Sequence, residues 1–340
     1  MAAIRIAQYG TGHGHAGGKM LAMRKNPDVE VAGLFEPDAE QRARFEKNDA
    51  YVGVRWYESA AEMLGDASIT AIAIEGRNDE SLGMAQESIA AKKHLWYDKP
   101  AGDDWAGYQA LIASTRTNER HIQMGYMLRY HEGFKRAATW ARDGLLGDVF
   151  SLRAHMSTFI PVTSESGLNV RSQVTRHRGG IFYDLAGHML DQVVWILGRP
   201  TKITTFFRND TTPELPGFAD NTLGVFEFDK ALATVDIAAM ETRPMARRFE
   251  IYGTRGSVIL LEPFEPGEEI RLCLDTAREG FEAGQQIIRI PKQDRQELYV
   301  RELASFVGFL RGEMAPTRTL EHEFLVQETL LRATGAAPGG

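Results

Sequence analysis

The chain has 340 residues, of which 39 are Lys or Arg and 46 are Asp or Glu, giving a formal net charge of −7 at pH 7; 43% are hydrophobic. This composition suits an ordinary folded protein of about two domains and excludes disordered and collagen-like chains. The acidic balance does not attract nucleic acid or anionic membranes, so neither partner is expected. The single cysteine, Cys273, excludes a disulfide framework and a Cys-rich zinc site and favours the cytoplasm.

The first half of the chain alternates short apolar runs with longer amphipathic segments. A strand over residues 4–9 starts so close to Met1 that we expect no signal peptide, and no apolar run is long enough to span a membrane. The predicted strands are 4–9, 29–35, 70–75, 94–97 and 122–126, and the predicted helices are 15–26, 38–48, 79–92 and 103–118. This alternation predicts a Rossmann-like, doubly wound parallel sheet over residues 1–122.

The second half has a different pattern. Predicted strands at 148–160, 201–210, 222–228, 231–239, 248–253 and 257–262 are separated in several places by tight turns, which indicates antiparallel pairing. Helices are expected at 181–197, 295–312 and 320–333. We therefore predict that residues 123–340 form an α+β domain with a large, mostly antiparallel sheet, which binds the substrate and forms the oligomer interface.

A glycine-rich turn follows the first predicted strand and precedes a predicted helix. Its residues are Gly10, Thr11, Gly12, His13, Gly14, His15, Ala16, Gly17 and Gly18. Glycines in such a turn let a diphosphate approach the backbone amides at a helix N-terminus. Gly10 and Gly12 fit the G-x-G-x-x-G pattern, whereas His15 occupies the position of the third glycine. A glycine-rich connection without a ligand is the alternative interpretation.

Glu36 ends the second predicted strand, where a carboxylate can accept hydrogen bonds from the ribose hydroxyls of a dinucleotide. The next residues, Pro37 and Asp38, offer no arginine for a 2′-phosphate, which favours NAD over NADP. Alternatively, Glu36 is a solvated acid near the start of the next helix, although Asp38 can fill that capping role.

Lys99 follows the fourth predicted strand in the sequence Asp98-Lys99-Pro100. The carboxyl ends of strands in a doubly wound sheet face the ligand crevice, so an ammonium there can stabilise a developing alkoxide. Pro100 would stiffen the turn, with a cis bond as one option. An exposed lysine in a turn is the alternative.

Asp184, His188 and Asp191 are spaced i, i+4 and i+7 and therefore lie on one face of a predicted helix. A neutral histidine there can take a hydroxyl proton, and a nearby carboxylate can orient it. A purely structural pair of Asp184 with His188 is equally compatible. A metal site would need further ligands from His155, His177 or Asp191 at a geometry that nothing fixes, so no metal is expected.

Together, the glycine turn, Glu36, Asp98-Lys99-Pro100 and the Asp184/His188 helix resemble the Gfo/Idh/MocA oxidoreductases, which include glucose–fructose oxidoreductase and inositol dehydrogenases. The resemblance spans essentially the whole chain. It implies that Lys99 polarises the substrate, His188 accepts its proton and Asp184 binds it. The family usually has Glu-Lys-Pro where this chain has Asp98-Lys99-Pro100, and Ala186 replaces the glycine of its Asp-x-Gly-x-His motif.

The resemblance also suggests residues around the cofactor and the substrate. The family commonly has Thr-Pro-Asn and then His after the third strand, whereas this chain has Gly76, Arg77, Asn78 and Ser81, a departure that leaves the local packing open. Gln123 is a candidate for the nicotinamide side. The further substrate-binding candidates are Arg129, Tyr130, Arg176 and His177, with Arg171 and Arg178 as possible members of the same basic rim. A salt-bridged arginine and a solvated basic loop are the alternatives.

The sequence therefore predicts an NAD(P)-dependent dehydrogenase that acts on a CH–OH group of a sugar, cyclitol or related polyol. A second hypothesis is a lyase or hydrolase that recycles bound NAD through transient oxidation, and a third is a dinucleotide-binding regulator without turnover. The apolar positions of the second-half strands predict a homodimer or homotetramer assembled through that sheet.

Overall fold

The computed structural model describes residues 2–261, 264 and 267–338, and its chain forms two compact units. The first unit comprises Met1–Met127 and Gln296–Phe324, and the second comprises Leu128–Arg295 and Leu325–Gly340. The division expected at residue 122 placed residues 296–324 with the second half, whereas their contacts group them with the first.

The first unit contains a five-stranded parallel sheet in the order β2-β1-β3-β4-β5. Its strands are β1 (Ile4–Tyr9), β2 (Val29–Phe35), β3 (Ala71–Ile74), β4 (His94–Tyr97) and β5 (Ile122–Met124). Its helices include α1 (Ala16–Lys25), α2 (Ala39–Phe45), α3 (Ala60–Gly65), α4 (Ser81–Ala90) and α5 (Trp105–Thr117). Every residue of β3 is fully buried, as expected for a strand with helices on both faces. This is the predicted doubly wound arrangement.

The second unit contains an eight-stranded sheet in the order β13-β12-β11-β10-β6-β9-β8-β7. The first four strands along the chain are β6 (Val149–His155), β7 (Lys202–Arg208), β8 (Asn221–Glu227) and β9 (Leu232–Ala238). The other four are β10 (Arg248–Gly253), β11 (Gly256–Leu260), β12 (Glu269–Leu274) and β13 (Gly284–Arg289). Its neighbouring strands pair antiparallel except β6 and β9, which are parallel. The predicted mostly antiparallel sheet is therefore confirmed.

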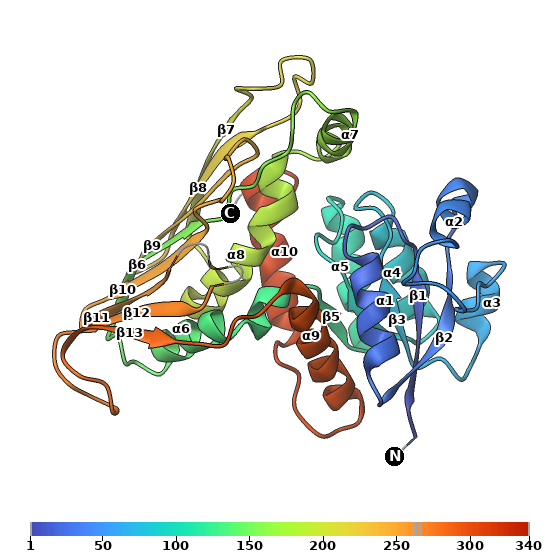
Figure 1. Cartoon of the computed structure of the whole chain (residues 1–340), viewed down its shortest axis with the longest axis horizontal. Helices are drawn as coiled ribbons and strands as arrows, with labels where there is room; N and C mark the ends of the chain where they lie inside the picture. The colour runs from blue at the N-terminus through green and yellow to red at the C-terminus, as the bar shows by residue number, and fades with distance from the viewer. Residues whose placement is uncertain (1, 262–263, 265–266, 339–340) are drawn as a thin grey trace. The chain divides into compact units, whose positions relative to one another are not determined.

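Helices cover one face of this larger sheet (Figure 1). They are α6 (Glu132–Arg142) and α8 (Ile181–Leu197), with α7 (Glu165–Val174) packed against α8. Side chains alternate along the strands, so Ala233, Val235 and Ile237 of β9 are buried beneath α8. The residues between them point to the opposite, outer face, which no described helix of this unit covers.

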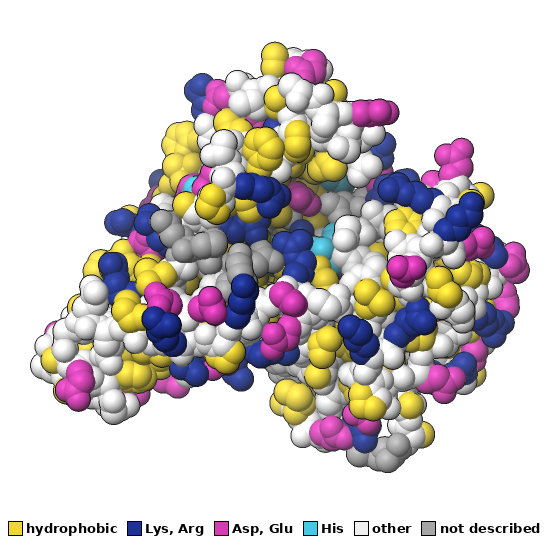
Figure 2. Space-filling model, viewed as in Figure 1, with side chains coloured by type: hydrophobic (Ala, Val, Ile, Leu, Met, Phe, Trp, Pro, Cys, Tyr) yellow, Lys and Arg dark blue, Asp and Glu magenta, His cyan; other side chains and the backbone are white. Residues whose placement is uncertain are grey.

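Three further elements link the units along the chain: the 3₁₀ turn η1 (Met127–Tyr130) and the helices α9 (Arg295–Leu310) and α10 (Leu320–Thr334). The sequence did not predict α3, α6, α7, η1, β12 or β13, and the end of the strand expected at 257–262 reaches residue 262, outside the described residues. None of the described helices is both long and apolar enough to cross a membrane. Figure 2 shows acidic and basic side chains interspersed over the visible face.

Candidate functional site

Four loops meet at the carboxyl edge of the parallel sheet in the first unit. The register pairs the last residues of neighbouring strands, Phe35 with Tyr9, Tyr9 with Ile74, and Ile74 with Tyr97. The segments that follow therefore begin side by side at one edge. They are the glycine turn after β1, Glu36 after β2, Gly76 to Ser81 after β3, and Asp98-Lys99-Pro100 after β4.

The glycine turn is packed so closely that side chains would not fit at two positions. Gly10 has a φ of +85°, and a Cβ there would lie 2.7 Å from the Cα of Gly76. A Cβ on Gly12 would lie 2.7 Å from Cγ of Arg77, whereas one on Gly14 would meet nothing within 4 Å. These contacts explain why glycine is needed at the first two positions, and they bring the turn after β1 against the turn after β3.

Glu36 is buried, with 5% of its surface exposed, and both carboxylate oxygens accept hydrogen bonds. Oε2 accepts from the backbone N of Thr11 at 2.6 Å and from its Oγ1 at 2.7 Å, and Oε1 accepts from the backbone N of Asp38 at 2.9 Å. Asp38 itself caps α2, as the sequence allowed. Glu36 is therefore a fixed buried acceptor at the end of β2 and not a solvated capping acid.

Arg77 is a residue near Glu36 that sequence reasoning missed. Its guanidinium Nη1 lies 3.8 Å from Oδ2 of Asp38, so an arginine from the third loop does reach the end of the second strand. It also pairs with Asp79 at 3.4 Å and with Glu80. Three carboxylates therefore neutralise the guanidinium of Arg77 at this edge of the sheet.

Asp98 and Lys99 are both buried, at 3% exposure each, and the backbone N of Lys99 donates to Oδ1 of Asp98 at 2.7 Å. The peptide bond between Lys99 and Pro100 is cis. The lysine is thus not the exposed turn residue of the alternative interpretation. Its backbone is held by the carboxylate of the preceding residue.

Lys19 is another buried lysine of this unit, to which no role was assigned from the sequence. Its Nζ lies 3.0 Å from Oδ2 of Asp98, 3.2 Å from Oε1 of Glu75 and 4.0 Å from Oε2 of Glu302. The ammonium also stands 4.4 Å from the centre of the Trp96 ring. Although burial opposes the charged form, these carboxylates raise the pKa of Lys19. Burial raises the pKa of Glu75 well above its usual value.

The two histidines of the glycine turn face the same carboxylate. Nδ1 of His13 lies 3.3 Å and Nδ1 of His15 lies 3.0 Å from Oδ2 of Asp98. The His15 ring also packs against Tyr299 of α9, with ring centres 5.3 Å apart. Burial lowers the pKa of His15 to about 4, although Asp98 opposes this shift, so His15 is neutral at pH 7. For Asp98, burial raises the pKa, but His13, Lys19 and His15 outweigh it and bring the pKa well below its usual value.

The other residues predicted in this unit lie on or near the same edge. Gly76 follows β3, and Ser81 begins α4, where its hydroxyl is 3.1 Å from the hydroxyl of Tyr97. Asn78 lies in the turn between them. Gln123 lies on β5, and its Nε2 donates to the backbone O of Glu302 at 2.9 Å, so one of its amide hydrogens ties the strand to α9.

In the second unit, helix α8 carries Asp184, His188 and Asp191 at the predicted spacing. His188 is 2% exposed and Asp191 is fully buried, whereas Asp184 is half-buried. Asp191 Oδ1 lies 2.7 Å from Nη2 and 2.8 Å from Nε of Arg129, and both side chains are inaccessible to solvent. Arg129 is therefore in the salt bridge that the sequence offered as an alternative.

The basic segment before α8 does not form one continuous rim. Arg171 is fully buried, where it donates to the backbone O of Ile160 at 2.7 Å and lies 3.7 Å from Asp220. It is a core residue of this unit, so its assignment to a pocket rim was wrong. The ring of His177 stacks on Tyr183 at 4.4 Å. Tyr130 is half-buried, whereas Arg176 is exposed.

Comparison with known proteins identifies this architecture. Residues 4–126 match the family model described as the oxidoreductase family, NAD-binding Rossmann fold, and residues 134–259 match the GFO/IDH/MocA C-terminal domain. The chain belongs to the GFO/IDH/MocA oxidoreductase family. The resemblance seen in the sequence is thereby confirmed, and the first unit is the NAD-binding Rossmann fold of this family.

Relatives within the GFO/IDH/MocA family are distant in sequence. Myo-inositol 2-dehydrogenase of Thermotoga maritima is 21% identical over 266 residues, covering 76% of this chain and 75% of that protein. The 1,5-anhydro-D-fructose reductase of Ensifer adhaerens is 20% identical, covering 92% and 90%. The uncharacterized oxidoreductase YrbE of Bacillus subtilis is 25% identical, but the match spans 58% of this chain and 56% of YrbE.

Solved structures of similar fold cover nearly the whole chain. An oxidoreductase from Agrobacterium radiobacter, crystallised with NAD⁺, L-tartaric acid and magnesium, has a TM-score of 0.81 at 16% identity, covering 98% of this chain and 96% of that one. An oxidoreductase structure from Erwinia carotovora has a TM-score of 0.80 at 20% identity, covering 98% and 99%. At these identities the likeness shows a shared fold.

The residues at the sheet edge fit the NAD that the family binds. The side chain of His15, the N-cap residue of α1, makes no capping hydrogen bond, and the amide of Ala16 donates to the backbone O of His13 at 3.2 Å. The amides that follow can face a diphosphate that the small glycine turn allows to approach. Glu36 is fixed at the end of β2, where the family fold would place a ribose, and its Oε1, which accepts one hydrogen bond, retains a lone pair for a hydroxyl donor. Arg77, already neutralised by acids, is poorly suited to a 2′-phosphate.

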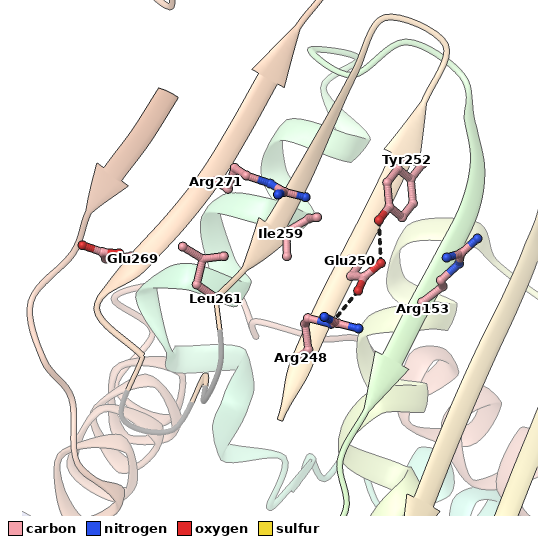
Figure 3. A pocket seen from close by; sticks show the side chains of 8 residues that line it. All are labelled: Arg153, Arg248, Glu250, Tyr252, Ile259, Leu261, Glu269 and Arg271. Atoms are coloured by element: carbon pink, nitrogen blue, oxygen red, sulfur yellow. Dashed lines mark hydrogen bonds and ion pairs between the residues drawn. The ribbon is translucent and has the colours of Figure 1, made fainter. Parts of the chain in front are cut away.

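A separate cavity of about 570 Å³ lies on the outer face of the eight-stranded sheet (Figure 3). Arg248 pairs with Glu250 at 2.6 Å, and the hydroxyl of Tyr252 donates to the same carboxylate at 2.5 Å. The guanidiniums of Arg153 and Arg271 line the cavity on either side. The centre of this face is therefore polar.

Proposed function

We propose that this protein is an NAD-dependent dehydrogenase that oxidises a secondary alcohol of a sugar, cyclitol or related polyol, or reduces the corresponding ketone. The observation that carries the proposal is Lys99, a buried lysine at the carboxyl end of β4 in the NAD-binding unit. The names of two relatives, an inositol dehydrogenase and an anhydrofructose reductase, support this substrate class.

Each proposed catalytic residue has a distinct task. NAD, when bound, accepts the hydride in the oxidation or, in its reduced form, supplies it in the reduction. Lys99 donates hydrogen bonds from its ammonium to the reacting oxygen and stabilises its negative charge. His188 accepts the hydroxyl proton during oxidation and returns it during reduction. Asp184, one helical turn before His188, binds the substrate beside it.

Other proposed contacts follow from the sheet edge. For the cofactor they are Gly10, Thr11, Gly12, His13, Gly14, His15, Glu36, Gly76, Asn78, Ser81, Asp98, Lys99, Pro100 and Gln123. For the substrate they are Lys99, Arg129, Tyr130, Arg176, His177, Asp184 and His188. Arg129 acts through its buried pair with Asp191, which fixes its guanidinium before substrate binds.

A panel of polyols and sugars with NAD, followed by NADH absorbance, tests the proposal. Lys99→Ala and His188→Ala should each lower kcat by about 10² to 10⁴-fold, the usual contribution of a positioned proton-transfer or charge-stabilising group. Lys25→Ala, at the exposed end of α1, is the matched control and should keep full activity. Unchanged turnover in both site variants would refute the assigned roles.

The same measurements separate the dehydrogenase from the other hypotheses. A lyase or hydrolase that recycles its cofactor would retain NAD during purification and convert a sugar without net NADH. A regulator would bind NAD without turning over any substrate of the panel. Either outcome would replace the proposed dehydrogenase reaction.

We further propose that the chain forms a homodimer or homotetramer through the outer face of the eight-stranded sheet. Phe206, Leu232 and Ile287 on β7, β9 and β13 point to this face and are 56%, 53% and 46% exposed. Apolar surface on an uncovered sheet favours burial against a second copy. Light scattering should give a multiple of 37.9 kDa for wild type and the monomer mass for Phe206→Glu with Leu232→Glu. A monomeric wild type would refute it.

A further inference from the structure

We propose that His13, His15 and Asp98 bind one divalent transition-metal ion such as Zn²⁺. All three residues belong to the first unit, and one ligand atom from each lies within 4.8 Å of the other two. Two imidazoles and one carboxylate form a recurrent ligand set for Zn²⁺ and for other first-row divalent metals. From the sequence, a metal site was considered only around His188, and no metal was expected.

The distances from the two histidine nitrogens to the Asp98 oxygen match those around a small metal ion. Zn²⁺ binds imidazole nitrogen and carboxylate oxygen at about 2.0–2.2 Å, so two ligands of a tetrahedral site lie about 3.4 Å apart and those of an octahedral site about 3.0 Å. Nδ1 of His13 and Nδ1 of His15 lie 3.3 Å and 3.0 Å from Oδ2 of Asp98. A metal can therefore enter with small shifts of the three side chains.

The backbone of the turn also orients the His13 ring. The backbone N of His15 donates a long hydrogen bond of 3.3 Å to Nδ1 of His13, the same atom that lies 3.3 Å from Oδ2 of Asp98. The ring nitrogen that would bind the metal is therefore already directed toward the carboxylate.

The buried carboxyl group of Glu75 stands beside the cluster. Its Oε1 lies 3.2 Å from the Lys19 ammonium, which also lies 3.0 Å from Oδ2 of Asp98. Neither oxygen of the fully buried Glu75 accepts a hydrogen bond among the described residues, and Oε2 lies 3.8 Å from Nδ1 of His13. Buried carboxylates need a donor or a metal to offset their desolvation. Glu75 would meet this need by acting as a fourth metal ligand or by accepting a hydrogen bond from a ligating histidine.

Three protein ligands leave a coordination position for water or for an oxygen of an anionic ligand. This consequence rests on the proposed function, because the ligating histidines belong to the glycine turn proposed to hold the diphosphate of NAD. A diphosphate oxygen is the anionic group that this turn would bring to the metal. The metal would then strengthen dinucleotide binding without being required for the fold of the turn.

The test begins with metal-free protein, prepared by dialysis against a chelator, and titration calorimetry with ZnCl₂. Wild type should bind one equivalent. His13→Gln, His15→Gln and Asp98→Asn should each weaken binding by at least the ~10 to 100-fold that loss of a supporting residue costs a metal site. His94→Gln and Cys273→Ser remove other potential ligands and should bind like wild type. Circular dichroism verifies that each variant is folded.

Cobalt provides a second readout that is independent of activity. Co²⁺ bound by two imidazoles and a carboxylate should give visible ligand-field bands without a thiolate charge-transfer band, and the bands should disappear in His15→Gln. Equal zinc affinity in all variants, or no zinc binding by wild type, would overturn the proposal. NAD binding is titrated separately in the presence of the chelator. If the protein binds NAD but not zinc, the metal site is refuted and the proposed function stands. If it binds zinc but not NAD, only the proposed role of NAD is refuted.

Discussion

Replacing Lys19 by Met is the sharpest test of the buried charge cluster in the first unit. The methionine fills most of the same volume but removes the ammonium that lies 3.0 Å from Asp98 and 3.2 Å from Glu75. Removing one partner of a fully buried ion pair costs about 3–5 kcal/mol, since the remaining charge stays desolvated. For a unit of this size that corresponds to a fall in Tm of about 6–20 °C.

The assay is thermal and urea unfolding of the metal-free protein with and without a second substitution. Asp98→Asn in the Lys19→Met background removes the stranded charge and should recover at least about 1 kcal/mol, so the two changes should be non-additive. The dependence of stability on pH provides a second test. Because His13, Lys19 and His15 lower the pKa of Asp98 against its burial, its stabilisation is present above about pH 4 and is lost as the pH falls. Lys19→Met should flatten that acid loss. A variant as stable as wild type, or additive effects, would refute the reasoning.

Three further predictions concern single residues. Glu36→Gln places an amide NH₂ against donors that include Thr11, so it should raise the Kd for NAD at least tenfold and lower the free energy of unfolding by about 1–3 kcal/mol; unchanged NAD affinity by fluorescence titration would contradict this. His155, whose pKa is raised to about 9 chiefly by its hydrogen bond to Asp236, stabilises the fold fully below about pH 6.5 and loses this contribution as the pH rises through 9. In urea melts, the free energy of unfolding of wild type should fall between pH 6 and pH 10, and His155→Asn should make that fall smaller by about 1 kcal/mol, a value that allows for the partial exposure of the pair. An equal fall in both proteins would count against this role of His155. Gly10→Ala, which forces a Cβ against backbone at a positive φ, should lower NAD affinity and Tm together, and a variant that binds NAD normally would disprove the close packing.

The parallel sheet could be predicted because its strands are continuous apolar runs. Residues 71–74 and 95–97 are buried on both faces, and such runs have few other interpretations. Strands β12 and β13 could not be found in this way. Segment 269–274 alternates polar and apolar side chains, a strand signal that was overlooked, whereas segment 284–289 has two glutamines followed by two isoleucines and shows no strand period.

The candidate site was predictable where one loop carries its own chemistry. Glu36 and Lys99 stand at strand ends, and their positions follow from the parallel topology. The partners of Lys19 lie just after β3, just after β4 and in α9, a combination that no local pattern shows. One signal was available: Lys19 is on the apolar helical face with Ala16 and Met23, so its burial could have been read from the spacing.

The return of residues 296–324 to the first unit has a consequence for how the polypeptide reaches its native state. Gln123 of β5 donates to the backbone of Glu302, and the backbone N of Met124 donates to Oε1 of Glu323. The last strand of the parallel sheet is thus held by segments made nearly 180 and 200 residues later. On the ribosome, the first unit cannot complete its packing until residues 296–324 have emerged, and a fragment ending at residue 127 would leave this edge uncovered and prone to aggregate.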